Sequence, residues 1–255
     1  MTPLSILDYR QPVEFRIGEV IIRSWNVLSR HFLTFVLLVG IAEVLPLVLT
    51  LYWQRMNSDL TGVAVVAQGT MVTAGIGLLQ FILTSFAQAI VVFAAFQDLR
   101  GRPVSAAESF RQGVGRLFPV ILSSVLTGLV IGVGFLLCIV PGLIAIAAFA
   151  VVLPACVVER LGPIESMHRS ADLTTGHRWP IMGAAAAWLV IIFVVTLTIQ
   201  AAMPGGAASL PKQLATWVWQ VLSGSYTAVY AAILYHDLRA VRDGIGIDEI
   251  ASVFD

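Results

Sequence analysis

The sequence predicts an all-α, polytopic membrane protein with six transmembrane helices. Three observations carry this prediction: long apolar runs recur along the chain, charged residues are scarce, and cations gather between the runs. Of the 255 residues, 58% are hydrophobic and 12% are charged, whereas about 25% of the residues of a soluble domain are charged. So little polar surface cannot coat a water-soluble globule. Because the net charge is zero, bulk electrostatics gives no indication of a nucleic-acid partner.

The spans follow from the length of each apolar run, because a helix needs about 20 apolar residues to cross the hydrocarbon core. We expect spans at roughly 32–53, 70–96, 117–139, 141–158, 180–203 and 214–235. The third and fourth runs count as two spans, since one helix of about forty residues would measure about 60 Å, twice the hydrocarbon thickness. A tight turn at Pro141-Gly142 therefore separates them. This turn puts Cys138 and Cys156 at opposite ends of a helix, too far apart for a disulfide.

The cations set the expected orientation. Apart from Arg55 and Lys212, the fifteen Lys and Arg residues lie in four segments that border apolar runs: Arg10 to Arg30, Arg100 to Arg116, Arg160 to Arg178, and Arg239 with Arg242. Cations stay on the cytoplasmic face during insertion. With six spans, all four segments lie on one side. We therefore expect a multi-pass protein of the bacterial inner membrane with both termini in the cytoplasm.

The chain repeats itself where every second span ends. An apolar end followed by an acid and an arginine occurs at Asp98-Leu99-Arg100, at Glu159-Arg160 and at Asp237-Leu238-Arg239. We therefore predict a single membrane domain of three units, at about 13–101, 102–162 and 163–244, with a short cytoplasmic tail at 245–255. Each unit is an amphipathic helix followed by a two-span hairpin.

The amphipathic segments carry arginines that suit anionic lipid. From Val13 to Phe32, apolar residues including Val20, Ile21, Trp25 and Leu28 share one helical face, and arginines form a separate stripe. The second segment begins at a Ser105 to Glu108 capping box, and the third, Pro163 to Trp179, has a narrow stripe of Ile164, Met167 and Ala171. The candidate headgroup ligands are Arg16, Arg23, Arg30, Arg111, Arg116, Arg169 and Arg178. Alternatively, these segments are ordinary loops whose arginines only set topology.

Glu43 is the one ionisable residue deep within a predicted span. A carboxylate there costs several kcal/mol, so it should face other helices. Pro46 weakens the same helix three residues later. The same depth in the second and sixth spans is occupied by Thr84, Ser85, Gln88, Ser223, Ser225 and Tyr226. We take Glu43, Gln88 and Tyr226 as candidates for one polar layer, which is either a transport site or a packing device.

Other motifs indicate packing rather than chemistry. Gly128 and Gly132 form a Gly-x-x-x-Gly face, which is typical of helix packing. The histidines border the spans at no spacing that a metal requires. No phosphate loop, nucleophile elbow or paired-acid site occurs. We therefore expect no metal, no cofactor, no catalytic residue and no enzymatic activity.

One stretch of the sequence resembles a known family. Its residues are Ile139-Val140-Pro141-Gly142, Leu153-Pro154-Ala155, Glu159 to Ser166, Arg169-Ser170 and Gly176 to Trp179. They resemble the membrane domain of bacterial membrane-bound glycerophosphodiester phosphodiesterases and related stand-alone inner-membrane proteins, and the likeness extends from Phe15 to Arg239. In those phosphodiesterases a separate soluble barrel is catalytic. The resemblance therefore implies a non-catalytic membrane module and carries over no active-site residue.

Together these observations favour a non-catalytic scaffold or accessory subunit that organises lipid or a partner membrane protein. Its expected partners are membrane lipids and another membrane protein or a second copy of itself. The alternative is a transporter or lipid-handling protein with a central polar site around Glu43. A wet, polar cavity touching Glu43 favours transport, whereas a dry bundle with a large exposed apolar flank favours partner binding.

Overall fold

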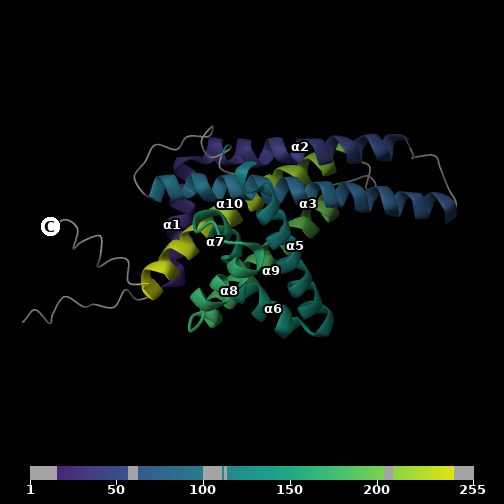
Figure 1. Ribbon diagram of the computed structural model, residues 1–255. Helices are drawn as coiled ribbons and strands as arrows, with labels where there is room; N and C mark the ends of the chain where they lie inside the picture. Colours follow the sequence, from purple (N-terminus) through teal and green to yellow (C-terminus); the bar gives the residue numbers. More distant parts are fainter. Residues whose placement is uncertain (1–15, 57–62, 100–110, 112–113, 204–208, 244–255) are drawn as a thin grey trace, which may run out of the picture.

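A computed structural model of the chain describes residues 16–56, 63–99, 111, 114–203 and 209–243, and its regular structure there is all α-helical. The helices are α1 (Ile17–Arg30), α2 (Phe32–Met56), α3 (Val63–Leu99), α5 (Leu117–Leu137), α6 (Ile139–Ala148), α7 (Val152–Val158), α8 (Pro163–Leu173), α9 (Arg178–Ala202) and α10 (Leu210–Asp243). Figure 1 shows α2 and α3 as a long pair lying side by side. The end of α10 lies beside α1 at one end of the molecule.

Five helical segments of the described chain are long and apolar enough to cross a membrane: Phe32–Met56, Gly69–Leu99, Leu117–Leu137, Ile139–Val158 and Arg178–Ala202. They correspond to the first five predicted spans. The sixth, 214–235, lies within α10, which is less apolar because Trp, Tyr, Ser, Thr and Gln alternate with its aliphatic residues. α10 packs instead against α3, α1 and α2. A helix enclosed by others along much of its length tolerates more polar residues than one facing lipid.

The three predicted units differ in their packing. α2 and α3 pack closely as a hairpin, as do α5 and α6, whereas α10 packs less against α9, its predicted partner, than against α1, α2 and α3. Ile181 is the buried residue of α9, so this helix lies at the periphery. The long helices of the third predicted unit thus pack less closely on each other than those of the first two, and the threefold repeat stays a prediction.

The turn between the third and fourth predicted spans lies earlier than expected. α5 ends at Leu137, and extended backbone at Cys138 leads into α6, whose first turn contains Pro141. Proline suits the first turn because its missing N–H has no helical acceptor there. Gly142 then faces Gly134 of α5, where an added Cβ on Gly134 would lie 3.0 Å from the Gly142 Cα. These two glycines allow the helix backbones to touch.

The predicted Gly-x-x-x-Gly face, Gly128 and Gly132, does not take part in this close contact. A Cβ added at Gly128 or Gly132 would meet nothing within 4 Å, so neither glycine packs against another described helix. The prediction named the right helix but the wrong glycines. The cysteine prediction is confirmed: Cys138 and Cys156 are both free, the first exposed and the second buried.

α1 lies within the first predicted amphipathic segment, with its buried face rotated from the expected one. Val20, Ser24 and Leu28 are buried, and the helix packs mainly on α10. Ile21 and Trp25, predicted on the same face, are exposed. One face of α1 thus packs against the protein, and a second apolar face is exposed. It runs across the direction of α2 and α3 (Figure 1), as an interfacial helix does.

α8 lies within the third predicted segment, and its buried face also differs from the expected one. The Glu165 carboxylate accepts a hydrogen bond from the Gly162 N–H at 3.1 Å and caps the helix. Ser166, Ser170 and Leu173 are buried, whereas Ile164 of the predicted stripe is exposed. The second segment's capping box at 105–108 lies outside the described residues.

The buried face of α8 closes a break in the fourth span. α6 ends at Ala148 and α7 begins at Val152, which interrupts the backbone hydrogen bonding between them. The Ser170 hydroxyl donates to the Ala148 carbonyl at 2.8 Å and accepts from the Val151 N–H at 3.3 Å. One side chain of α8 therefore satisfies both sides of the break.

The core lies toward the end of the molecule at which α10 ends. Phe35 of α2 and Ile233 and Tyr235 of α10 are fully buried there. Met71 and Leu136, near the opposite ends of α3 and α5, are largely exposed. Figure 1 shows the α2–α3 pair and the α5–α6 pair diverging in that direction. The molecule is therefore tightly packed at one end and open at the other.

Candidate functional site: a polar pocket at the open end

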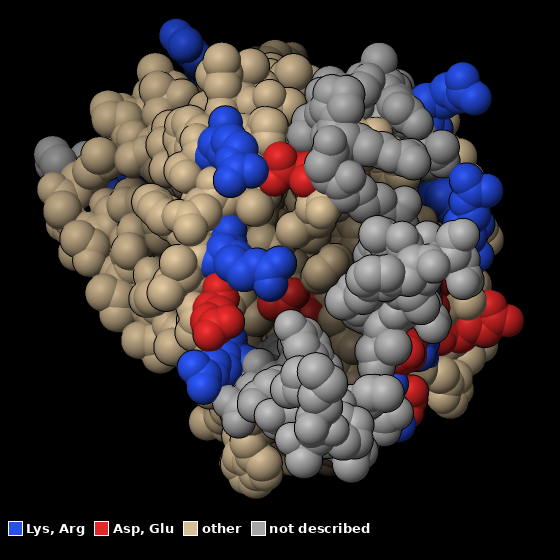
Figure 2. Space-filling view, turned by 90° about the vertical axis from the view of Figure 1, so that its left-hand side faces the viewer, with Lys and Arg blue, Asp and Glu red and all other residues tan. Residues whose placement is uncertain are grey.

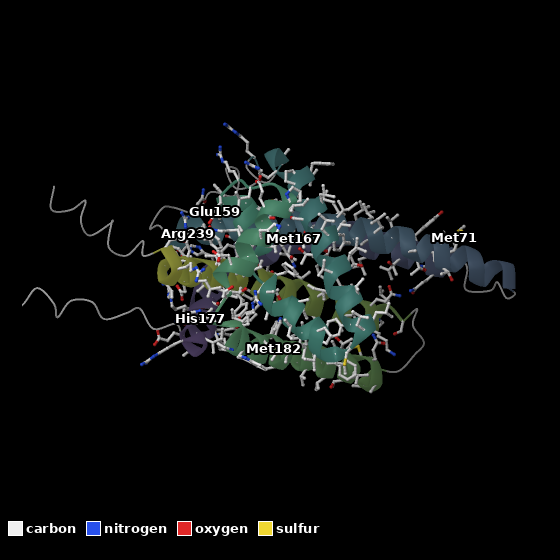
Figure 3. All side chains as sticks on the ribbon, turned by 60° about the horizontal axis from the view of Figure 1, so that its bottom comes forward. Met71, Glu159, Met167, His177, Met182 and Arg239 are labelled. Carbon is white, nitrogen blue, oxygen red and sulfur yellow. The ribbon has the colours of Figure 1, made fainter. Side chains whose placement is uncertain are left out.

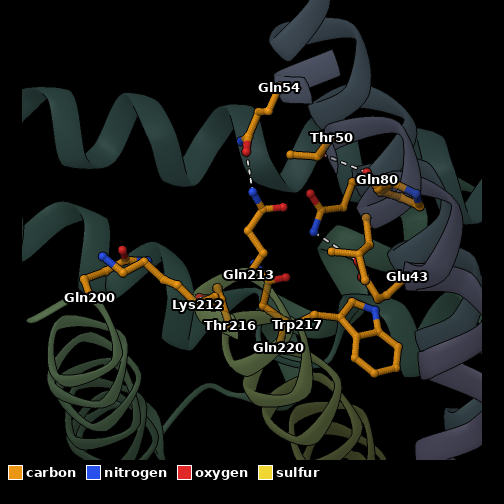
Figure 4. Close-up of a pocket in the computed structure, with 12 residues that line it drawn as sticks. Glu43, Thr50, Gln54, Gln80, Gln200, Lys212, Gln213, Thr216, Trp217 and Gln220 are labelled. Atoms are coloured by element: carbon orange, nitrogen blue, oxygen red, sulfur yellow. Dashed lines mark hydrogen bonds between the residues drawn. The ribbon is translucent and has the colours of Figure 1, made fainter. Parts of the chain in front are cut away.

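A polar pocket of about 240 Å³ lies between α2, α3, α9 and α10, toward the open end (Figure 4). Five of its lining residues are glutamines: Gln54, Gln80, Gln200, Gln213 and Gln220. Amide side chains both donate and accept hydrogen bonds. The pocket is thus equipped to surround a small polar molecule without a strong net charge from its walls.

Glu43 supplies a carboxylate to this pocket. The residue is 4% exposed, and its two carboxylate oxygens accept hydrogen bonds from Gln80 Nε2, at 3.0 Å, and from the Thr84 hydroxyl. Burial of a charged group is costly unless hydrogen bonds replace its water. One donor on each oxygen offsets part of that cost and fixes the direction of the carboxylate.

A cation lines the same pocket. Lys212 is 8% exposed, and Figure 4 shows it beside Gln200, on the opposite side of the pocket from Glu43 and Gln80. A hydrogen bond from Gln213 to Gln54 joins α10 to α2 between the two sides. Opposite charges thus face one small space.

The other two members of the predicted polar layer lie elsewhere. Gln88 is half-buried and does not line the pocket. Tyr226 lines two apolar cavities on another side of α10, where its ring lies 4.6 Å from the Trp188 ring. The predicted contact between Glu43 and the second span is present through Thr84, which was placed at the same depth, and also through Gln80, which was not.

The sequence analysis missed most of the pocket. Residues 80, 84 and 88 share one face of a helix because they lie four apart, so Gln80 was as accessible to that reasoning as Gln88. Gln88 was chosen because it lies at the same predicted membrane depth as Glu43. The pocket instead extends from Glu43 toward the open end, where Gln80 lies. No sequence signal placed Lys212 in the same pocket as Glu43, because the two belong to helices far apart in the chain.

The opposite, charged end gathers the acids of the repeated motif, and each pairs with a cation of a predicted amphipathic segment. Figure 2 looks onto this end and shows acidic and basic side chains in contact. Arg30 lies 3.6 Å from Asp98, Arg23 lies 2.8 Å from Asp237, and Arg169 lies 3.0 Å from Glu159. The acids of the repeat therefore form the ion pairs by which α1 and α8 contact the rest of the bundle.

Glu159 is the centre of the largest of these clusters. Arg169 and Tyr235 both donate hydrogen bonds to it, and Arg239 lies near it (Figure 3). Arg169 also donates to Asp243. Burial alone would lower the pKa of Arg169, but hydrogen bonds to Asp243 and Glu159 outweigh it and raise that pKa above its ordinary value. The guanidinium therefore stays charged throughout the pH range in which proteins work.

Ion pairs between described residues engage four of the seven candidate headgroup arginines. Besides Arg23, Arg30 and Arg169, Arg16 lies 3.8 Å from Glu19, and both of these side chains are well exposed. Arg178 donates to the Ala171 carbonyl at 3.1 Å. Arg111 is exposed and Arg116 is half-buried. Binding of lipid headgroups by these seven residues stays a prediction.

The described residues contain no group of three or more His, Cys, Asp or Glu that could hold a metal ion. Two of the boundary histidines contact acids instead. His31 Nε2 lies 2.8 Å from Asp98, and His236 Nδ1 lies 3.1 Å from Asp237. These histidines therefore belong to the ion-paired end.

A model of one protein family, described as a domain of unknown function (DUF7847), matches residues 70–238, more than half of the chain. The chain belongs to the DUF7847 family. The DUF7847 match contains the pocket residues of α3, α9 and α10, whereas Glu43 and the rest of α2 precede it. No curated protein and no solved structure matches the chain.

Proposed function

We propose that this protein is a non-catalytic, solute-binding membrane protein of the transporter class. Its site is the pocket between α2, α3, α9 and α10, and its key side chain is Glu43. The single observation that supports this function is the nearly fully buried Glu43 carboxylate, which lines a polar cavity between four long helices. Polar groups at membrane depth are costly and commonly mark a substrate or ion path.

The chemistry of the pocket indicates the class of solute. A carboxylate favours a solute with an ammonium or other cationic group, and the surrounding amides favour further polar groups. The volume, about 240 Å³, is just below the usual range of about 300–1,000 Å³ for ligand sites. We infer a small amine or amino-acid-sized molecule rather than a large substrate.

The proposed topology keeps six spans, with α10 as the sixth, inside the bacterial inner membrane. α10 supports this because its length, 34 residues, exceeds the roughly 20 needed to cross. The cations at the charged end favour a cytoplasmic position for that end. The pocket would then open toward the periplasm.

The experiment is ligand-dependent stabilisation of the purified protein with Glu43→Gln as the variant. Glycine, ethanolamine and ammonium serve as probes, and the melting temperature is the readout. An amine that stabilises the wild-type protein should lose most of its effect in Glu43→Gln, since the amide keeps the shape but not the charge. Glu19→Gln, an exposed acid outside the pocket, should respond like the wild type. If Glu43→Gln responds like the wild type, the carboxylate does not bind the solute.

A scaffold or accessory role is the second candidate, and α9 favours it. Ile181 is its buried residue, while Leu189, Val190, Phe193, Val194 and Leu197 are exposed. Such a flank suits either lipid or a helix of a partner protein. The resemblance to a membrane domain that accompanies a separate catalytic barrel also supports this role. Phe193→Trp would then disrupt co-purification of a partner membrane protein and leave solute binding unchanged.

A further inference from the structure

We propose that an apolar groove between α1, α9 and α10 binds the hydrocarbon chain of one membrane lipid, and that Tyr230 donates a hydrogen bond to an oxygen at the headgroup end of that lipid. Two cavities, of about 410 and 610 Å³, form this groove. Both are lined by Ile21, Trp188 and Tyr226, so the two cavities adjoin along these side chains. This site is separate from the polar pocket and does not depend on the proposed function.

The walls of the groove select a hydrocarbon. The lining residues of both cavities are aliphatic, aromatic, or Ser and Thr, with no charged side chain. Trp188 forms an aromatic wall with Tyr226, at 4.6 Å between ring centroids, and with Trp219, at 6.4 Å. Aromatic rings give a large apolar surface that loses little conformational freedom on binding. A charged solute would lose its hydration here without compensation.

Two residues that line the groove, Tyr230 and Trp219, carry buried donors, which indicates that the ligand brings an oxygen. Among the described residues, Tyr230 Oη and Trp219 Nε1 are buried and have no hydrogen-bond partner. A buried donor left unpaired is destabilising, so a ligand that supplies an acceptor gains affinity from it. The two residues are eleven positions apart on α10, about 16 Å at 1.5 Å per residue. One oxygen therefore serves one of them.

The positions of the two residues along α10 indicate that the lipid oxygen binds Tyr230. This residue lies close to Asp237 and the charged end, whereas Trp219 lies deeper toward the open end. Membrane lipids carry their oxygens at the interface and their hydrocarbon inside. A lipid oriented in this way puts its oxygen near Tyr230 and extends its chain past Trp219.

α1 explains why the occupant comes from the membrane. Its outward face contributes Ile22 and Trp25, which are 62% and 63% exposed, to the groove. The Arg16 and Arg30 side chains on the same helix are also well exposed, at 65% and 66%. An apolar edge bordered by cations matches a lipid with an anionic headgroup.

The first test fills the groove. The full chain, purified in a mild detergent, is mixed with phosphatidylglycerol, and bound lipid is counted by native mass spectrometry. Ala185 lines the groove and Ala186 does not, so Ala185→Phe and Ala186→Phe form a matched pair. We expect one lipid on the wild type and on Ala186→Phe, and at least a tenfold lower occupancy on Ala185→Phe. Equal occupancy on all three proteins would overturn the proposal.

The second test removes the donor. Tyr230→Phe keeps the ring and should weaken lipid binding about fivefold, the effect of one hydrogen bond. Unchanged binding would show that the tyrosine hydroxyl takes no part.

A third measurement does not require that the protein fold with phenylalanine at position 185 or 186. Phosphatidylglycerol brominated in its acyl chain should quench Trp219, which lines the groove, more than Trp217, which lines the polar pocket. Trp219→Phe should therefore lower the quenched fraction of the total fluorescence, and Trp217→Phe should raise it. The reverse order would contradict a chain in the groove.

Discussion

Ser170 shows how a single side chain can hold an interrupted span together. Its hydroxyl donates to one side of the α6–α7 break and accepts from the other, and the residue is fully buried. Water cannot replace these contacts at such a site, because the surrounding residues exclude it. The hydrogen bonding of the fourth span therefore depends on a serine of α8.

We expect Ser170→Ala to destabilise the protein by about 1–3 kcal/mol, because it leaves the buried Val151 N–H unpaired. Thr175→Ala is the matched control, since that exposed hydroxyl bonds only to the Ala171 carbonyl of its own helix. Thermal unfolding in detergent measures both. A melting temperature for Ser170→Ala equal to that of Thr175→Ala would show that the break does not need the serine.

Residue-level prediction succeeded where one side chain was exceptional in its surroundings. Glu43 was identified because a carboxylate is rare within an apolar run. Gln54, Gln200 and Lys212 lie near the ends of predicted spans, where polar residues are common and carry little information. Their convergence on one pocket depends on the tertiary packing of α2, α9 and α10.

At the scale of the element, the α5–α6 hairpin depends on a backbone contact. A Cβ on Gly134 would lie 3.0 Å from the Gly142 Cα, and a Cβ on Gly142 would lie 2.6 Å from the Phe135 ring. Both distances are shorter than ordinary van der Waals contact. A larger residue at Gly134 therefore requires a shift of the α6 backbone, and one at Gly142 requires a shift of the Phe135 ring.

Gly134→Ala should therefore destabilise the hairpin by about 1–3 kcal/mol, the usual cost of overpacking. Gly132→Ala adds the same methyl group to the same helix in open space, and should be neutral or stabilising by up to about 1 kcal/mol. Thermal unfolding of the two variants in the same detergent is the measurement. The opposite ranking would contradict the close approach of α5 and α6.

At this scale, prediction from sequence located the apolar spans but misassigned the buried faces of the amphipathic helices α1 and α8. Hydropathy located the first five spans because length and composition suffice to identify a helix that can cross a membrane. It did not find the break after Ala148, since the sequence stays apolar there. The buried faces of α1 and α8 were misassigned because packing against α10 and the α6–α7 break, rather than apolar periodicity, decides them.

At the scale of the whole molecule, the charged end joins helices that are far apart in the chain. Glu159 ends α7, Arg169 belongs to α8, and Tyr235 and Arg239 belong to α10. Their cluster is mostly buried, whereas the Arg242–Asp172 pair is about half exposed. The two interactions therefore differ in how strongly water screens them.

Glu159→Gln should lower stability by about 2 kcal/mol, because it weakens charge-assisted hydrogen bonds to Arg169. Asp172→Asn should cost well under 1 kcal/mol, the usual effect of an exposed pair. Melting temperatures at neutral pH compare the two. Since the raised pKa of Arg169 lies above its ordinary value, its contribution is fully present below the ordinary arginine pKa, and alkaline buffers up to pH 9 should leave the difference unchanged.

The proposed orientation predicts which cysteine reacts in intact cells. Cys138 is exposed at the turn between α5 and α6, and Cys156 is buried. A membrane-impermeant maleimide should therefore label the wild-type protein from the periplasm, and Cys138→Ser should abolish the labelling. Labelling that requires disrupted cells would reverse the assignment of the two faces.

The short length of α6 has a consequence for biosynthesis. Its ten residues measure about 15 Å, half the hydrocarbon thickness. A segment of that length is a poor independent substrate for the translocon, which recognises a full apolar stretch. α6 and α7 together make one apolar stretch of 20 residues, Ile139–Val158, so we expect the translocon to insert them as one span. The break after Ala148 is closed only after the ribosome has delivered Ser170 of α8.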